Sequence, residues 1–219
     1  MRKLIALTVI AALFATLCGC KTENEYLSHV SELRQDIYVG STNGYTLTAY
    51  YGFQEKPFVN DGKCGALIYG YTIKLNIIAD ETQRKIEINN DGEILNGIFK
   101  CDENTGEYKA FIETEKHFDK TFSANLICGA ESTPVTLNSI LPEDCLSYAD
   151  TLNILSTSQT SLLESYKTGE EFNAEIYMRV FVKNENPYWF VGIASGNNLL
   201  KAFLTDGKTG EVLAIREIT

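Results

Sequence analysis

Hydrophobic and polar residues alternate along the chain from residue 45 to about residue 138. A period of two is typical of β-strands that bury one face, and these runs are rich in β-branched and aromatic residues. Asn-Asp-Gly and Asn-Thr-Gly sequences at 60–62, 90–92 and 104–106 tolerate positive φ and predict tight turns. After a first short strand at 37–39, the expected strands are 45–53, 66–79, 84–88, 93–99, 107–113 and 120–128.

Helical spacing marks two other parts of the chain. Leu27, Val30 and Leu33 predict a helical turn before the first strand. A longer helix is expected to begin at Pro142, because apolar residues then recur at steps of three and four up to Tyr166. The Ser- and Thr-rich stretch 156–161 weakens this helix, and Gly169 is a stop signal beyond it.

Four further strands are expected after the helix, at 172–183, 188–195, 199–205 and 211–217. In the first of them apolar residues from Phe172 to Val182 alternate with mostly polar ones, so one face can receive the helix. Two domains are therefore expected. Residues 26–138 form an all-β, Ig-like sandwich, and residues 139–219 form a small α+β domain with the helix on a four-stranded antiparallel sheet.

The first residues have the features of a secretory leader. A basic start is followed by an apolar stretch, Leu4–Leu17, which is too short to span a bilayer. Leu17-Cys18-Gly19-Cys20 resembles the lipobox of bacterial lipoproteins. The resemblance implies cleavage after Gly19, which would remove residues 1–19 as a signal peptide. Residues 20–25 would then be a polar linker with a lipid on the Cys20 sulfur.

The expected location follows from this anchor: the bacterial cell membrane, on its extracytoplasmic face. Removal of Arg2 and Lys3 with the leader leaves 17 Lys and Arg residues against 29 Asp and Glu residues, a net charge of −12. Such a balance argues against nucleic acid as a partner. Envelope proteins, peptides or cell-wall material are the expected partners besides the membrane.

Four cysteines follow the anchor. They can form disulfides in an extracytoplasmic compartment, and the sequence leaves both free thiols and one or two bridges open. No two lie at Cys-x-x-Cys spacing, so neither a zinc site nor a redox centre is expected. The four are Cys64, Cys101, Cys128 and Cys145.

The C-terminal part is similar to the closing hairpin of PepSY-like domains. The similarity rests on Trp189 in one strand and on the Asp206-x-x-Thr209-Gly210-Glu211 sequence after the next. Asp206 is expected to accept hydrogen bonds from backbone N–H groups of the turn, with Thr209 and Gly210 completing it. The resemblance implies an extracytoplasmic domain that binds or restrains peptidases, and it implies no catalytic residue.

Other candidate chemistry is weaker. His29 and His117 are the only histidines, and neither lies in a recognisable nucleophile motif. The acidic loops at 102–104 and 206–207 lack the spacing of an EF-hand and are interpreted as turns. No metal, cofactor or catalytic residue is assigned.

Tyrosines of two neighbouring strands give the best candidate for a binding surface. They could stack on a sugar or a peptide, or else fill a sandwich core with their hydroxyls at its rim. The function expected is that of a binding or regulatory module and not of an enzyme, with an envelope hydrolase or a structural spacer as alternatives. The five tyrosines are Tyr45, Tyr50, Tyr51, Tyr69 and Tyr71.

Overall fold

The computed structural model describes residues 24–217, except for 58, 60, 77–82, 91, 104, 196 and 197. The leader, the linker up to residue 23 and Cys20 therefore lie outside the described residues. None of the helices in the described part is long and apolar enough to cross a membrane.

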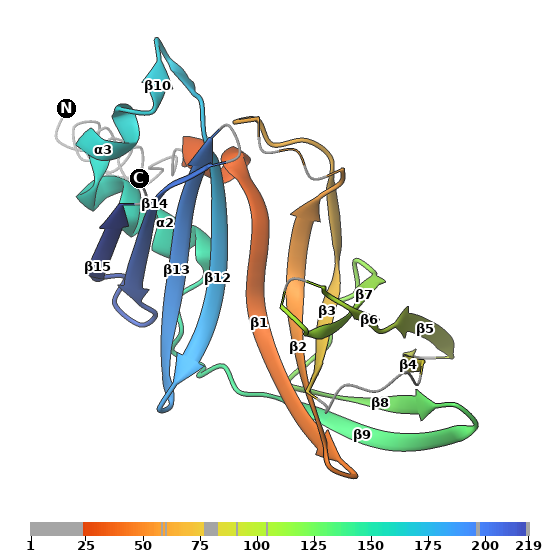
Figure 1. Ribbon diagram of the computed structural model, residues 1–219. Helices are drawn as coiled ribbons and strands as arrows, with labels where there is room; N and C mark the ends of the chain where they lie inside the picture. The colour runs from red at the N-terminus through yellow and green to blue at the C-terminus, as the bar shows by residue number, and fades with distance from the viewer. Residues whose placement is uncertain are drawn as a thin grey trace, which may run out of the picture.

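Most of the described chain is antiparallel β-structure (Figure 1). Its main path is β15-β14-β13-β12-β1-β2-β3-β7-β6, from which a branch of β4, β5, β8 and β9 extends. The strands of the main path, in chain order, are β1 (Val30–Thr42), β2 (Tyr45–Glu55), β3 (Leu67–Asn76), β6 (Lys100–Cys101), β7 (Tyr108–Glu113), β12 (Glu175–Lys183), β13 (Asn186–Ser195), β14 (Asn198–Asp206) and β15 (Val212–Glu217). Those of the branch are β4 (Arg84–Asn90), β5 (Glu93–Ile98), β8 (Thr121–Cys128) and β9 (Glu131–Ser139).

Strand β1 joins the two halves of the chain. It pairs antiparallel with β2 from Glu32 to Thr42 and parallel with β12, where Arg34 stands opposite Arg179. The β1–β2 hairpin closes through Asn43 and Gly44, whose φ angles of 45° and 80° are those of a two-residue turn with left-handed central residues. The N-terminal and C-terminal strands thereby belong to one continuous sheet.

The expected strands from residue 45 onward are confirmed, with shifted ends. The helical turn expected at 27–33 is only partly present, because a 3-10 helix, η1 (Glu25–His29), ends where β1 begins. Val30 and Leu33 are core residues of β1 instead. Strand β9, which carries Pro134 and pairs with β8 and β1, was not among the expected strands.

The helical segment begins later than expected. Helix α2 (Tyr148–Ser158) starts at Tyr148 and not at Pro142, because the Ser147 side chain accepts a hydrogen bond from the Asp150 N–H at 3.1 Å and caps it. The chain leaves helical geometry at Gln159, within the Ser- and Thr-rich stretch, before α3 (Thr160–Glu164). Gly169, with φ 68°, lies in the turn between two short strands, β10 (Lys167–Thr168) and β11 (Glu171–Phe172).

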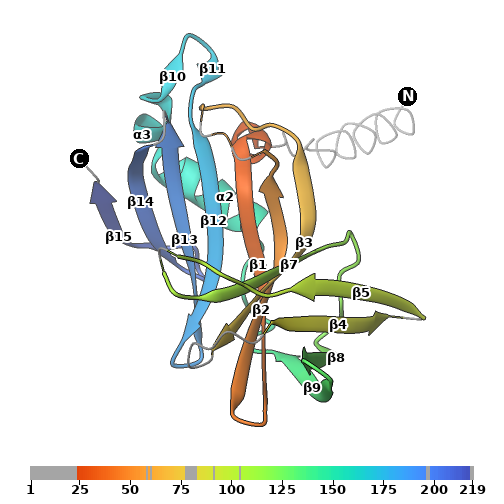
Figure 2. The same ribbon diagram turned by 45° about the vertical axis from the view of Figure 1, so that its right-hand side comes forward.

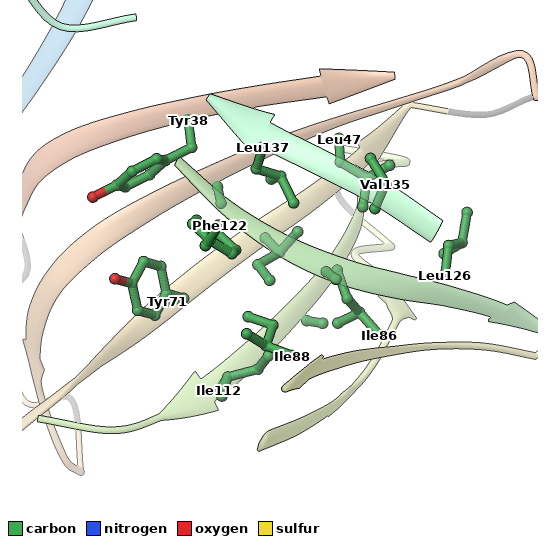
Figure 3. Close-up of a cluster of buried hydrophobic side chains, with 14 of the residues drawn as sticks. Tyr38, Leu47, Tyr71, Ile86, Ile88, Ile112, Phe122, Leu126, Val135 and Leu137 are labelled. Carbon is green, nitrogen blue, oxygen red and sulfur yellow. The ribbon is translucent and has the colours of Figure 1, made fainter. Parts of the chain in front are cut away.

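Two hydrophobic cores stabilise the molecule. In one, side chains of β1, β2, β3 and β7 meet those of β4, β8 and β9, as Figure 3 shows for Tyr38, Tyr71 and Phe122. In the other, Leu152 and Leu155 of α2 pack against β1, β12, β13 and β14. Trp189 of β13 lies in this second core with 1% of its surface exposed, and its Nε1–H donates to the Leu146 carbonyl at 3.1 Å.

Candidate ligand-binding site

The central strands have one face that no described helix covers. In β12 the core residues Ile176, Met178 and Val180 point toward α2, so that Arg179 and Phe181 point the other way. Figures 1 and 2 show α2 behind these strands in both views. We call the opposite side the open face. Its side chains used below are Glu32, Arg34, Tyr50, Lys74, Arg179, Phe181 and Phe190.

Two arginines lie side by side on the open face and share one carboxylate. Arg34 and Arg179 are direct neighbours in the parallel register of β1 and β12. Glu32 accepts hydrogen bonds from Arg179 Nε at 2.9 Å and Nη2 at 2.7 Å, and its Oε1 lies 2.8 Å from Arg34 Nε. Burial raises the pKa of Glu32, but the two guanidinium groups outweigh this effect and hold it below its usual value.

Tyr50 lies between two cations. The Arg34 guanidinium is 5.7 Å and the Lys74 ammonium 5.9 Å from the centroid of its ring, distances at which cation–π attraction operates. Lys74 in turn contacts Glu107 at 2.9 Å. Burial raises the pKa of Tyr50, although Arg34 opposes this, so the hydroxyl is protonated at neutral pH. The Tyr50 hydroxyl is therefore a neutral hydrogen-bond donor among charged side chains.

Two cavities border Tyr50. One, of about 310 Å³, is bounded by Arg34, Tyr50, Arg179, Val180, Phe181 and Phe190. The other, of about 390 Å³, is bounded by Thr46, Thr48, Tyr50, Lys74, Leu75, Asn76, Gly106 and Glu107. The last two residues belong to the β6–β7 hairpin, which crosses in front of the central strands in Figure 2.

Glycines leave the floor beside Arg34 without side chains. Gly52 stands opposite Arg34 in the β1–β2 register, and Gly70 stands opposite Gly52 in β3. A Cβ atom on Gly52 would lie 1.8 Å from the Leu33 carbonyl oxygen, so the strands approach here more closely than a larger residue allows. The close approach coincides with a bulge between Arg34 and Asp36 in β1.

The structure does not bring the five predicted tyrosines onto one surface. Strand alternation separates Tyr50 from Tyr51: Tyr51 lies in the first core, whereas Tyr50 borders the two cavities and packs partly against the second core. Tyr51 stands opposite Tyr71, with ring centroids 4.9 Å apart, and the two are 5% and 0% exposed. Tyr69 is 40% exposed beside Phe53, at 5.3 Å between ring centroids.

The buried tyrosine hydroxyls form hydrogen bonds at the end of the core. Tyr51 donates to the Glu115 carbonyl at 3.0 Å, and Tyr71 accepts from the Phe118 N–H at 2.7 Å. Tyr45 is half-buried with its ring 5.6 Å from the Arg84 guanidinium carbon. This is the arrangement of core-filling tyrosines that the sequence left open as the alternative to a binding surface.

His117 has a carboxylate partner. Its Nε2 lies 2.9 Å from Asp36 Oδ2 and 3.4 Å from the Tyr38 hydroxyl. Burial raises the pKa of Asp36, although His117 opposes this. Neither cavity on the open face includes His117. Within the described part of the chain, no three His, Cys, Asp or Glu side chains are placed to hold a metal ion.

The Asp206 turn is closed by its own side chain. Asp206 Oδ1 accepts hydrogen bonds from the N–H groups of Lys208 and Thr209, both at 2.9 Å, and from the Thr209 hydroxyl at 3.2 Å. Gly210 has a φ of 74° and completes the turn. These hydrogen bonds stabilise the turn itself. Asp206 Oδ1 is therefore used within the turn and is not available to accept a hydrogen bond from a ligand.

Cys64, Cys101, Cys128 and Cys145 are free thiols in the structure. Cys101 is exposed, whereas Cys64, Cys128 and Cys145 are half-buried. The sequence left both free thiols and disulfide bridges open, and the described residues show free thiols.

Sequence reasoning missed the charged residues of the open face. Glu32 lies within the helical turn that was expected and Arg34 directly after it, and Arg179 was interpreted only as part of a polar strand face. Alternation in 175–183 indicated that Arg179 and Phe181 share a face, but it did not indicate their partners. No protein-family model matches the chain, and no curated protein or solved structure is significantly similar to it. The geometry of the side chains is therefore what bears on function.

Proposed function

We propose that this chain is a lipid-anchored extracytoplasmic binding module whose ligand occupies the open face. The observation that carries the proposal is Tyr50, a half-buried aromatic ring that has two cations 5.7 and 5.9 Å from its centroid and borders two cavities. Apolar walls combined with a few convergent polar groups are typical of ligand sites. The partner is an envelope protein, a peptide or cell-wall material.

Placement in the envelope rests on the leader. Leu17-Cys18-Gly19-Cys20 supports a lipid on Cys20, and the ligand-binding part then faces outward from the bacterial cell membrane. Mass spectrometry of the N-terminal peptide tests this. A diacylglyceryl group on Cys20 is the expected result, and an unmodified peptide that begins at Met1 would overturn the placement.

A division into two units belongs to the same proposal. Residues 26–138 form an Ig-like sandwich, and residues 139–219 form a PepSY-like domain with its helix on four antiparallel strands. The consecutive antiparallel pairing of β12 through β15 and the packing of α2 on them support the second unit. The closing of a core between β1–β3 and β4, β8 and β9 supports the first.

Binding at the open face is tested by photo-crosslinking of the full-length chain in bacterial cells. A photoreactive phenylalanine analogue replaces Phe181 on the open face or, as the control, Ile154 on α2, and each of these side chains is 37% exposed. We expect a defined covalent adduct from position 181 and none from position 154. Equal adducts at both positions, or no adduct at position 181, would contradict the proposal.

A second candidate function is hydrolysis in the envelope. The observation that favours it is the 2.9 Å contact between His117 Nε2 and Asp36 Oδ2, because a carboxylate that orients a histidine is a part of many acid–base sites. Hydrolysis of envelope peptides and glycans by the intact chain, lost in His117→Ala and kept in His29→Ala, would support it. Equal activity of both variants would exclude this role for His117.

A further inference from the structure

We infer that the open face recognises a polypeptide segment in which a carboxylate adjoins an aromatic or branched apolar side chain. The inference rests on the proposed function and names the ligand class for the same site. It follows from the unused donors of Arg34, the local charge, the apolar walls beside them and the polar cavity across Tyr50.

Arg34 is the cation with donors to spare. Arg179 is held by Glu32 through two nitrogens, and Lys74 is paired with Glu107. Arg34 has Glu32 as its only ion-pair partner among the described residues, through Nε, and its guanidinium carries further N–H groups. A guanidinium offers parallel N–H donors that match the two oxygens of a carboxylate.

The charge around Arg34 suits a monoanion. Two guanidinium groups and the Glu32 carboxylate leave a net charge of +1 at this point of the face. A carboxylate balances that charge. A phosphate monoester brings a charge near −2 at neutral pH, and the excess would be repelled by Glu32.

Aromatic walls flank the two arginines. Phe181 is 37% exposed and stacks on Tyr188, with ring centroids 5.5 Å apart and 24° between the planes. Phe190 stands opposite Arg179 in the register of β12 and β13 and lines the same cavity. An apolar group attached close to the bound carboxylate would therefore cover Phe181 and remove apolar surface from water.

The second cavity supplies groups that match a peptide backbone. Thr46, Thr48 and Asn76 line it, and hydroxyl and amide side chains can both donate and accept hydrogen bonds. A peptide bond needs both kinds of partner, because its N–H donates a hydrogen bond and its carbonyl accepts one. Because Tyr50 borders both cavities, a chain anchored by its carboxylate at Arg34 extends past the ring into this polar region.

Three small probes test the ligand class: N-acetyl-phenylalanine, its neutral amide and N-acetyl-alanine. Binding is followed through the backbone amide signals of the full-length chain by NMR. We expect N-acetyl-phenylalanine to bind about tenfold more tightly than the amide, since a charge-assisted pair is lost. N-acetyl-phenylalanine should also bind several-fold more tightly than N-acetyl-alanine. The chemical-shift changes of the backbone amides should be largest around Arg34, Tyr50 and Phe181.

Variants separate the two preferences. Arg34→Gln abolishes the preference for the acid over the amide, whereas Phe181→Ala reduces only the preference for phenylalanine over alanine. Lys208→Gln removes a cation from a turn beside α2, where it pairs with Asp144, and keeps both preferences. Unchanged core signals of Leu155 and Val191 show that each variant is folded.

The outcomes distinguish the inference from the proposed function. Equal binding of acid and amide at the open face, or an unchanged preference in Arg34→Gln, overturns the ligand class and leaves the binding face in place. If none of the three probes binds but the crosslinking adduct forms at position 181, the ligand class is likewise overturned and the binding face stays in place. Absence of that adduct as well overturns both.

Discussion

Glu32 of β1 accepts two hydrogen bonds from Arg179 of β12, a residue 147 positions away, at 2.9 and 2.7 Å. The same carboxylate contacts Arg34 at 2.8 Å, so that one acid compensates two neighbouring cations. Without it, two guanidinium groups would stand unscreened in adjacent strands. Glu32 therefore contributes both to the pairing of β1 with β12 and to the charge of the open face.

Replacement of Glu32 by Gln is expected to lower the free energy of unfolding by about 2 kcal/mol at pH 7, because it leaves two guanidinium groups without their anion. The loss is smaller than for a fully buried pair, since the Arg34 and Arg179 side chains are 28% and 42% exposed. Urea denaturation measures the change. Glu131→Gln at the exposed start of β9 is the control and should match the parent chain.

The Glu32 contribution should also depend on pH. The folded-state pKa lies below the ordinary Glu value of 4.5, so the stabilisation is complete above pH 4.5 and is lost as the pH falls through the folded-state pKa. The stability difference between the parent chain and Glu32→Gln should therefore shrink toward pH 3. A difference that stays constant from pH 7 to pH 3 would show that the ion pair is not its source.

Gly52→Ala should be among the most destabilising single-methyl additions in the chain. The new Cβ would lie 1.8 Å from the Leu33 carbonyl oxygen, and a backbone atom cannot rotate away. We expect a loss of about 3 kcal/mol or more. Gly129→Ala is the comparison, because its φ of 62° is strained but no atom lies within 4 Å of the added Cβ, and about 1 kcal/mol is expected. Equal losses in urea denaturation would disprove the steric explanation.

Asp206→Ala should cost about 1 kcal/mol of stability, since two backbone N–H groups and the Thr209 hydroxyl lose their acceptor. The side chain of the neighbouring Lys208 forms a surface ion pair with Asp144, at 2.8 Å. Lys208→Ala should therefore change stability by less than about 0.5 kcal/mol. Thermal unfolding of both variants decides whether the turn depends on its side-chain acceptor.

Cys145 should react with N-ethylmaleimide at pH 8 more than about tenfold more slowly than Cys101, because the thiolate is the reactive form. Burial raises the pKa of Cys145 to about 11, whereas Cys101 is exposed. Peptide mass spectrometry of timed samples gives the two rates. Both cysteines should react at similar rates in urea, and equal rates in the folded chain would contradict the burial of Cys145.

Local patterns predicted most of the strands and the interruption of the helical segment. Alternation identified β12 through β15, and the Ser- and Thr-rich stretch correctly marked the place where helical geometry ends at Gln159. The start of β1 was wrong because Val30 and Leu33 lie at a helical spacing of three, and a register shift between Val30 and Glu32 brings both into one core within a strand. Pairing with β2 and β12 decided in favour of the strand.

The tyrosine surface could not be judged from the chain alone. Tyr50 and Tyr51 are adjacent in sequence, so any strand must send them to opposite faces, but the sequence does not tell which face is covered. Packing of β4, β8 and β9 placed Tyr51 in a core, while Tyr50 borders the two cavities.

Short-range patterning was sufficient for strands, turns and the Asp206 hairpin, because those features depend on backbone preferences within a few residues. The meeting of Arg34, Arg179 and Tyr50 on one face depends on the parallel register of β1 and β12, a contact between distant segments. Such a register is set by the burial of two cores at once, and no local period encodes it. The chemistry of the open face was therefore a result of tertiary packing.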